Sequence, residues 1–196
     1  MGDTIVERLY GDFKQLVEHL NKSVEPSLCS AAEDNFRKSL LLAAASYFED
    51  RLTAVLVSFV GNASNRNVLV TEFVRIRAIS RQYFSLFEWE AGNANKFFSC
   101  FGSSFSTFMK AEVKADDELA KAIKAFIEIG LERNRLVHQN FGTFTLEKTA
   151  EEIFTLYQTA STFIDVMPIK LQQYLGALAS TDNLNAVGDK SEKIEL

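Results

Sequence analysis

Three side chains with the chemistry of an acid–base site lie close together in the chain, namely Arg133, Asn134 and His138. Imidazole is the side chain whose charge changes most readily near neutral pH, so His138 is the candidate general base. A guanidinium can donate charge-assisted hydrogen bonds to an oxygen that gains negative charge, which is a role for Arg133. Asn134 could orient the imidazole or donate to the same oxygen. Residues 133–138 therefore carry the strongest functional signal in the sequence.

The spacing of these residues decides which of them can meet. At about 3.6 residues per turn, Asn134 and His138 share a helix face, whereas Arg133 and His138 lie about 140° apart. One helix therefore does not direct both side chains at one atom, but two such helices about a two-fold axis could place them in one cleft. On spacing alone a structural interpretation is favoured, because basic side chains in the last turns and a glycine, here Gly142, are typical of a helix C-terminus.

An acidic pair interrupts an apolar helical stretch earlier in the chain. Glu49 and Asp50 follow directly after Tyr47 and Phe48, so one of the two carboxylates must point close to the apolar face. A charge in that position is costly unless it lies at a surface rim, pairs within the helix or serves a site. The sequence leaves these interpretations open.

A basic run, Arg75, Arg77 and Arg81, falls in the third predicted helix. Arg77 and Arg81 would share a face at this spacing, while Arg75 would be displaced around the axis. Such a run is more typical of a solvated face that pairs with acids such as Glu72 than of a groove for RNA phosphates.

Several common sites are absent from the sequence. It contains no Walker-type glycine loop, no G-x-G-x-x-G turn and no H-E-x-x-H pair. The two histidines, His19 and His138, fall in different predicted helices, and Cys29 and Cys100 stand far apart without metal-ligand spacing. We therefore expect neither a metal nor a cofactor, and two reduced thiols in a cytoplasmic protein.

Charge and hydropathy narrow the classes of partner. The net charge of −5 argues mildly against a protein that coats nucleic acid, although an enzyme that only cuts RNA needs no more than a local basic patch. The longest apolar stretch, around residues 52–60, is too short to span a bilayer, so no membrane association is expected.

Helices must position all of these residues, because apolar side chains recur at three- and four-residue steps and no strand-period segment is found. At 196 residues the chain is long enough for one domain, predicted over 1–180 and followed by a polar, disordered tail over 181–196. The only prolines are Pro26 and Pro168, so long helices are permitted. We predict an all-α bundle with short extra helices between residues 93 and 110 and long helices over residues 5–20, 30–59, 67–87, 116–142 and 145–178, the last interrupted at Pro168.

At the motif the sequence resembles a known family. Arg133 to His138 fits the R-x4–6-H signature of the HEPN superfamily, and residues 133–142, RNRLVHQNFG, are similar to the form in its RiboL-PSP-HEPN branch. Residues 42–50, LAAASYFED, and residues 93–102, NANKFFSCFG, strengthen the likeness. The resemblance spans roughly residues 35–165.

This resemblance implies an up-down bundle of four or five main helices, a homodimer formed through the motif helices, and metal-independent endoribonuclease activity. Many such domains are toxins or anti-phage effectors, which an antitoxin or an ATPase sensor can hold silent. The implied catalytic residues are Arg133, Asn134 and His138, supported by Glu49 or, as a second choice, Asp50. Apart from the resemblance, the candidate RNA-binding residues are Arg135, Arg77 and Arg81.

The implied reaction uses the 2′-hydroxyl of RNA as nucleophile and leaves a 2′,3′-cyclic phosphate and a 5′-hydroxyl. His138 would take the proton of that hydroxyl, Arg133 would stabilise the phosphorane, and the second chain's histidine could protonate the leaving oxygen. The alternative is a non-catalytic helical module, which dimerises or holds a nucleotide as a subunit of a larger complex. The acidic net charge and the lack of a second acid–base group in one chain favour that alternative.

Overall fold

The computed structural model describes residues 4–191, and for residues 181–191 the backbone alone. Within this range the protein is all-α, as predicted, and no strand is formed. The elements in chain order are α1 (Ile5–Lys22), α2 (Pro26–Ala63), α3 (Val68–Val74), the π-turn η1 (Arg75–Ile79), the 3-10 turns η2 (Tyr83–Leu86) and η3 (Trp89–Ala91), α4 (Asn95–Ser99), α5 (Ser103–Ala115), α6 (Asp117–His138) and α7 (Ala150–Ser191).

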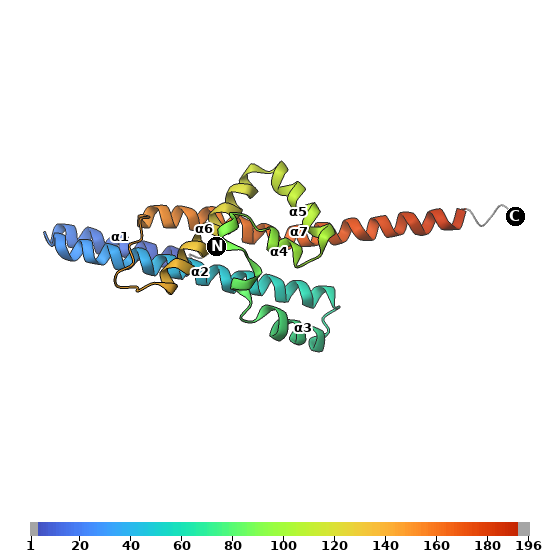
Figure 1. Ribbon diagram of the computed structural model, residues 1–196, viewed down its shortest axis with the longest axis horizontal. Coiled ribbons are helices and arrows are strands. Elements are labelled where there is room, and N and C mark those ends of the chain that lie inside the picture. The colour runs from blue at the N-terminus through green and yellow to red at the C-terminus, as the bar shows by residue number, and fades with distance from the viewer. Residues whose placement is uncertain (1–3, 192–196) are drawn as a thin grey trace.

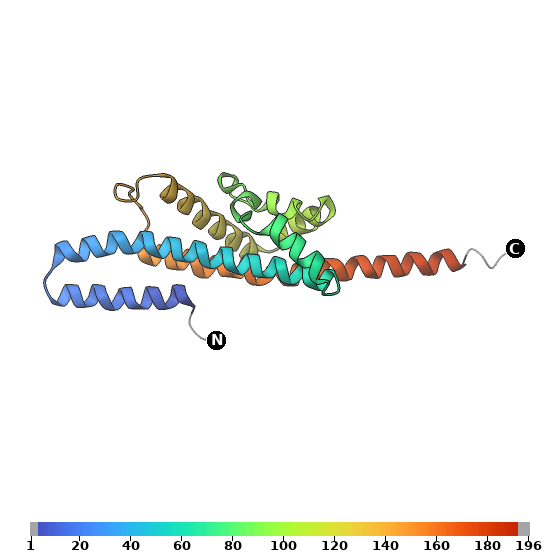
Figure 2. The same ribbon diagram turned by 90° about the horizontal axis from the view of Figure 1, so that it is seen from below.

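The four longest helices of the described chain, α1, α2, α6 and α7, form an up-down bundle in which successive members run in opposite directions (Figure 2). Helix α1 lies on one side of α2 and α7, while α6 and the short helices lie on the other. Contacts join α6 to α7, α1 to α2, and α2 to both α6 and α7. Helix α7 extends well beyond the bundle at its C-terminal end (Figure 1). The predicted bundle with short extra helices is therefore confirmed.

Polar side chains determine where several helices begin. Thr4 and Glu7 form a capping box at the start of α1, and Thr149 and Glu152 exchange the same pair of bonds before α7. Asp116 accepts hydrogen bonds from the first backbone N–H groups of α6. Each cap satisfies donors that have no partner inside the helix.

Phenylalanine rings fill the centre of the bundle where α2, α4, α6 and α7 meet. Phe48, Phe97, Phe126 and Phe163 are fully buried. The ring of Phe126 lies 5.6 Å from that of Phe48 and 5.0 Å from that of Phe163, centroid to centroid. Aromatic pairs at such separations stabilise a core beyond the area that they bury. This cluster fixes α6, and with it the motif, against α2 and α7.

The predicted third helix over residues 67–87 is wrong in its second half. Helix α3 ends at Val74, the π-turn η1 ends at Ile79, and the chain then breaks direction. Arg81 has a φ of 62°, in the left-handed region, so it cannot continue a right-handed helix. Arg77 and Arg81 therefore do not share a helix face as the spacing predicted.

The bounds of α2 and α6 also differ from the prediction. Helix α2 begins at Pro26 rather than Ser30, because proline suits the first turn, where its missing N–H costs nothing. Helix α6 ends at His138, so Gly142 lies in the following loop and does not cap the helix. His138 is therefore the last helical residue.

Helix α7 is longer than predicted and begins at Ala150 rather than Thr145. Pro168 lies inside it without ending it. Within the tail predicted over residues 181–196, the described backbone continues α7 as far as Ser191, and residues 192–196 lie outside the described residues. The division into a domain over 1–180 and a disordered tail stays a prediction. Neither α7 nor any other helix over residues 4–191 has the length and apolarity needed to cross a membrane.

Candidate functional site

Asn134 and His138 line one groove at the C-terminal end of α6. Its volume is about 460 Å³, within the range of small-molecule sites. Asn134 is half-buried and His138 is exposed. The shared face predicted from their spacing is therefore observed. The remaining lining residues are Glu88, Trp89, Glu90, Leu131, Arg135 and Gln139.

Arg133 leaves the helix on another side and is not among the residues that line this groove. Its guanidinium carbon lies 3.7 Å from the centroid of the Phe84 ring, and its Nη1 donates to the side-chain oxygen of Asn134 at 3.3 Å. No ion pair joins Arg133 to any carboxylate in the described part of the chain. The N–H groups of a guanidinium point outward in the plane of the guanidinium itself. When its face lies against an aromatic ring, these N–H groups stay available to an anion.

The turn η3 is fixed tightly against the motif helix. Trp89 is buried and donates from Nε1 to the backbone oxygen of Phe84 at 3.0 Å. Its ring packs so closely on Gly130 of α6 that a Cβ atom there would lie 1.9 Å from Cζ3. Only glycine at position 130 permits this approach. The contact therefore holds Glu88 and Glu90, on either side of Trp89, at the groove that contains His138.

Glu88 and Glu90 line the groove, although no sequence pattern pointed to them. Both carboxylates are exposed at the groove, and neither has an ion-pair partner among the described side chains. They belong to a segment that reads as a loop, and loop residues carry no periodicity that would place them near α6. Only the packing of Trp89 against Gly130 brings them there.

Glu49, the first choice for the supporting acid, lies on the Arg133 side of the motif. Burial raises the pKa of the Tyr83 hydroxyl well above its usual range; Glu49 raises it further, and Arg133 lowers it. Both charges therefore act on the same buried phenol. Glu49 is half-buried, whereas Asp50 is exposed. Neither Glu49 nor Asp50 forms an ion pair with Arg51 of the same helix. Arg51 pairs instead with Asp165 of α7 at 2.8 Å.

The basic residues differ in their availability. Arg75 pairs with Glu72 at 2.6 Å, as expected of a solvated face. Arg135 lines the groove but pairs with Glu132 at 2.8 Å. Arg77 and Arg81 are exposed, and no ion pair occupies either of them within the described residues. Arg81 lies three residues before Phe84 in the chain, and Phe84 carries the ring that Arg133 contacts.

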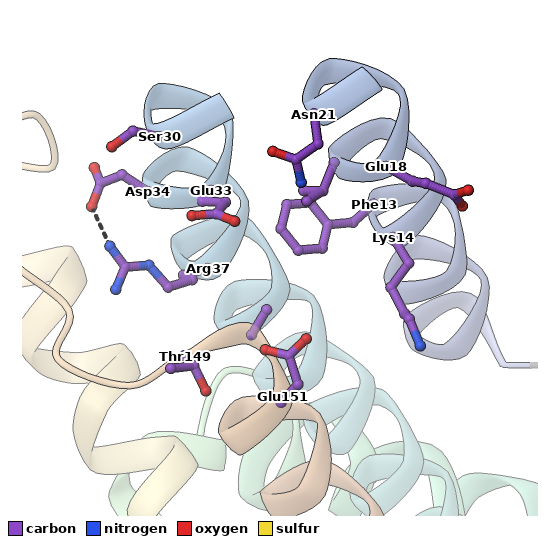
Figure 3. Close-up of a pocket in the computed structure, with 12 residues that line it drawn as sticks. Phe13, Lys14, Glu18, Asn21, Ser30, Glu33, Asp34, Arg37, Thr149 and Glu151 are labelled. Atoms are coloured by element: carbon purple, nitrogen blue, oxygen red, sulfur yellow. Dashed lines mark hydrogen bonds and ion pairs between the residues drawn. The ribbon is translucent and has the colours of Figure 1, made fainter. Parts of the chain in front are cut away.

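A cavity of about 750 Å³, larger than the groove at the motif, lies between α1, α2 and the start of α7 (Figure 3). Its charged lining is mixed, with two bases and four acids. None of Arg133, Asn134 and His138 contributes to it. Its volume alone therefore does not identify it as the site.

Comparison with protein families gives a match between residues 7–173 and the family model described as RiboL-PSP-HEPN. The chain belongs to this family. The match covers α2, α6 and the whole motif segment, α1 from Glu7 onward and α7 as far as Gln173. Comparisons with curated proteins and with solved structures gave no match.

Membership of the RiboL-PSP-HEPN family supports a ribonuclease in general terms, without assigning residues. HEPN domains are generally associated with ribonuclease activity. The described part of this HEPN chain contains no group of three or more His, Cys, Asp or Glu side chains placed to hold a metal ion. The roles of individual residues rest on the geometry above and on the chemistry of their side chains.

Proposed function

We propose that this HEPN domain is a metal-independent endoribonuclease that cuts RNA by attack of the 2′-hydroxyl on the adjacent phosphate. The observation that carries the proposal is the end of α6, where an exposed imidazole and an amide share one groove beside an arginine that has no carboxylate partner. Arg51 and Arg75, in contrast, each pair with an acid.

The groups have the properties that each step requires. His138 Nε2 or Nδ1 takes the proton of the 2′-hydroxyl, whose oxygen then bonds to phosphorus. The phosphorane carries two negative charges, and the free N–H groups of Arg133 stabilise it in a position fixed by Phe84 and Asn134. The bond to the 5′-oxygen breaks, and this oxygen takes a proton from a second imidazole. The products are a 2′,3′-cyclic phosphate and a 5′-hydroxyl.

A symmetric dimer supplies what one chain lacks. Within one chain Arg133 lies outside the groove that contains His138, and only one histidine is present there. Two motif helices about a two-fold axis would give one cleft two copies of each residue. Val137 and Phe141, which are 44% and 42% exposed beside His138, offer apolar surface for that interface. Glu49 would act as the supporting acid on the Arg133 side.

The substrate path and the cellular role follow from the same proposal. Arg77 and Arg81 are free cations on the segment that leads to Phe84, and together with Arg135 they would hold RNA phosphates near the cleft. We extend the proposal to a cytoplasmic effector of the toxin or anti-phage kind, with an antitoxin or an ATPase sensor as regulatory partner, because the family resemblance implies this role for many members.

Cleavage in the presence of EDTA tests the proposal. The wild-type protein is expected to cut single-stranded RNA at the same rate with and without the chelator, because none of the steps above uses a metal. Fragments should carry 2′,3′-cyclic phosphate and 5′-hydroxyl ends, which phosphatase and kinase treatment followed by mass spectrometry identifies. Loss of cleavage in EDTA, or fragments with 5′-phosphate ends, would contradict the mechanism. RNA that is bound but never cut would favour the non-catalytic module.

A further inference from the structure

A charged cluster on α2, built around one buried lysine, holds the loop that follows the motif helix. Lys38 is only 2% exposed, although a lysine is rarely buried unless its charge is paired. Its Nζ donates to Asp34 Oδ2 at 2.8 Å and to the backbone oxygen of Phe141 at 3.0 Å. The same ammonium lies 5.2 Å from the centroid of the Phe141 ring. Lys38 therefore fixes both the backbone and the ring of a residue three positions after His138.

Arg37 makes the second attachment to this loop. Its Nη1 donates to the backbone oxygen of Leu146 at 3.1 Å, and its Nη2 donates to Asp34 Oδ1 at 3.1 Å. Figure 3 shows the bond between Asp34 and Arg37 on α2, near the segment that leads to Thr149. One carboxylate thus holds two cations, and each cation holds one loop carbonyl. The hydrogen bond from Lys38, followed by the charges of both cations, holds the pKa of the Asp34 carboxyl below its usual range despite some desolvation.

Burying a charged side chain costs free energy, so this cluster is an inefficient way to stabilise the fold. Burying an ammonium removes its hydration, and an apolar side chain of similar volume often gives equal or greater stability. The cluster instead determines where the loop after His138 lies. Helix α6 ends at His138, and the next anchored residue is Phe141, whose exposed ring belongs to the surface proposed for the dimer.

We propose that Asp34, Arg37 and Lys38 form a positioning cluster that sets the place of His138 in the cleft by holding the loop over residues 139–149 on α2. The inference rests on the proposed function for its effect on rate, but not for its effect on structure. None of the three residues lines the groove that contains His138. Their effect passes through the backbone of Phe141 and Leu146.

Lys38→Met tests the cluster, because methionine keeps much of the volume and removes the ammonium. Three results are expected. Amide hydrogen exchange over residues 139–149 rises about tenfold or more, while exchange in α2 stays unchanged. The NMR resonances of the His138 ring move, whereas those of His19, the only other histidine, stay in place. The kcat for RNA cleavage falls about tenfold or more with KM within about twofold, since small misplacements of a catalytic group are costly.

Lys121→Met is the matched control. Lys121 lies on the motif helix itself but is exposed and pairs only with Glu118, so its removal should leave loop exchange, the His138 resonances and kcat unchanged. Asp34→Asn removes the shared carboxylate from a partly exposed position and should produce the same changes as Lys38→Met. It serves in its place if the methionine variant does not fold.

The readouts separate the two proposals. Unchanged loop exchange and unchanged His138 resonances in Lys38→Met and Asp34→Asn would overturn the positioning cluster, even if the protein cuts RNA. A fall in kcat that only follows a fall in Tm and a rise in exchange throughout the protein would overturn it as well. If the wild-type protein cuts no RNA, the proposed function fails, and the exchange and NMR results still decide whether the cluster positions His138.

Discussion

The His138→Ala variant is expected to cut RNA at least about 10²-fold more slowly than the wild-type protein, because it lacks the group that accepts the proton of the 2′-hydroxyl. The helix content should not change, since His138 is exposed at the last position of α6 and packs against little. Initial rates on a labelled single-stranded RNA, together with far-UV circular dichroism, measure both quantities.

His19→Ala is the matched control for this prediction. His19 lies on α1 and is absent from the groove at the motif, so its removal should leave the rate unchanged. An equal rate for His138→Ala and the wild-type protein would end the assignment of His138 as the general base. Equal losses in both variants would show that histidine removal acts through the fold.

Mixing two inactive variants is expected to restore cleavage. Arg133→Ala lacks the guanidinium that stabilises the phosphorane, and His138→Ala lacks the base, so each homodimer should be nearly inactive. A heterodimer retains one Arg133 and one His138 on different chains, and a composite cleft combines the guanidinium with the base. Cleavage therefore returns in part, because the second imidazole that protonates the leaving oxygen is still missing. Activity after co-refolding, well above that of either variant alone, is the expected outcome.

The mixing result depends on a dimer, which sedimentation can establish separately. At micromolar concentration the wild-type protein should sediment at about twice the chain mass of 22.0 kDa. A protein that sediments as a monomer and cuts RNA at full rate would contradict the composite cleft. It would leave the role of His138 intact.

Local patterns were enough to predict the main helices and the shared face of the motif. Asn134 and His138 line one groove because a four-residue spacing brings side chains together on any α-helix. The apolar residues around Glu49 and Asp50 predicted that one of the two acids comes close to the apolar face, and the structure shows that Glu49 is the half-buried one. These features depend on neighbours in sequence, which periodicity describes well.

Features that depend on contacts between distant segments could not be predicted in this way. Helix periodicity continued through residues 67–87, but the break at Arg81 is set by how the chain returns to pack Tyr83 and Trp89 in the core. Glu88 and Glu90 reach the groove only because Gly130, on another element, leaves room for Trp89. The burial of Lys38 likewise depends on a loop about one hundred residues away along the chain.

The most direct test of the central claim is an RNA with a single 2′-deoxy nucleotide at the scissile position. The wild-type protein should fail to cut at that position, because the nucleophile is gone, while binding changes little, since phosphate contacts dominate affinity. Parallel cleavage and binding assays against the all-ribose strand measure both effects. Efficient cutting of the substituted strand, or of an all-DNA strand, would contradict attack by the 2′-hydroxyl and the mechanism built on His138.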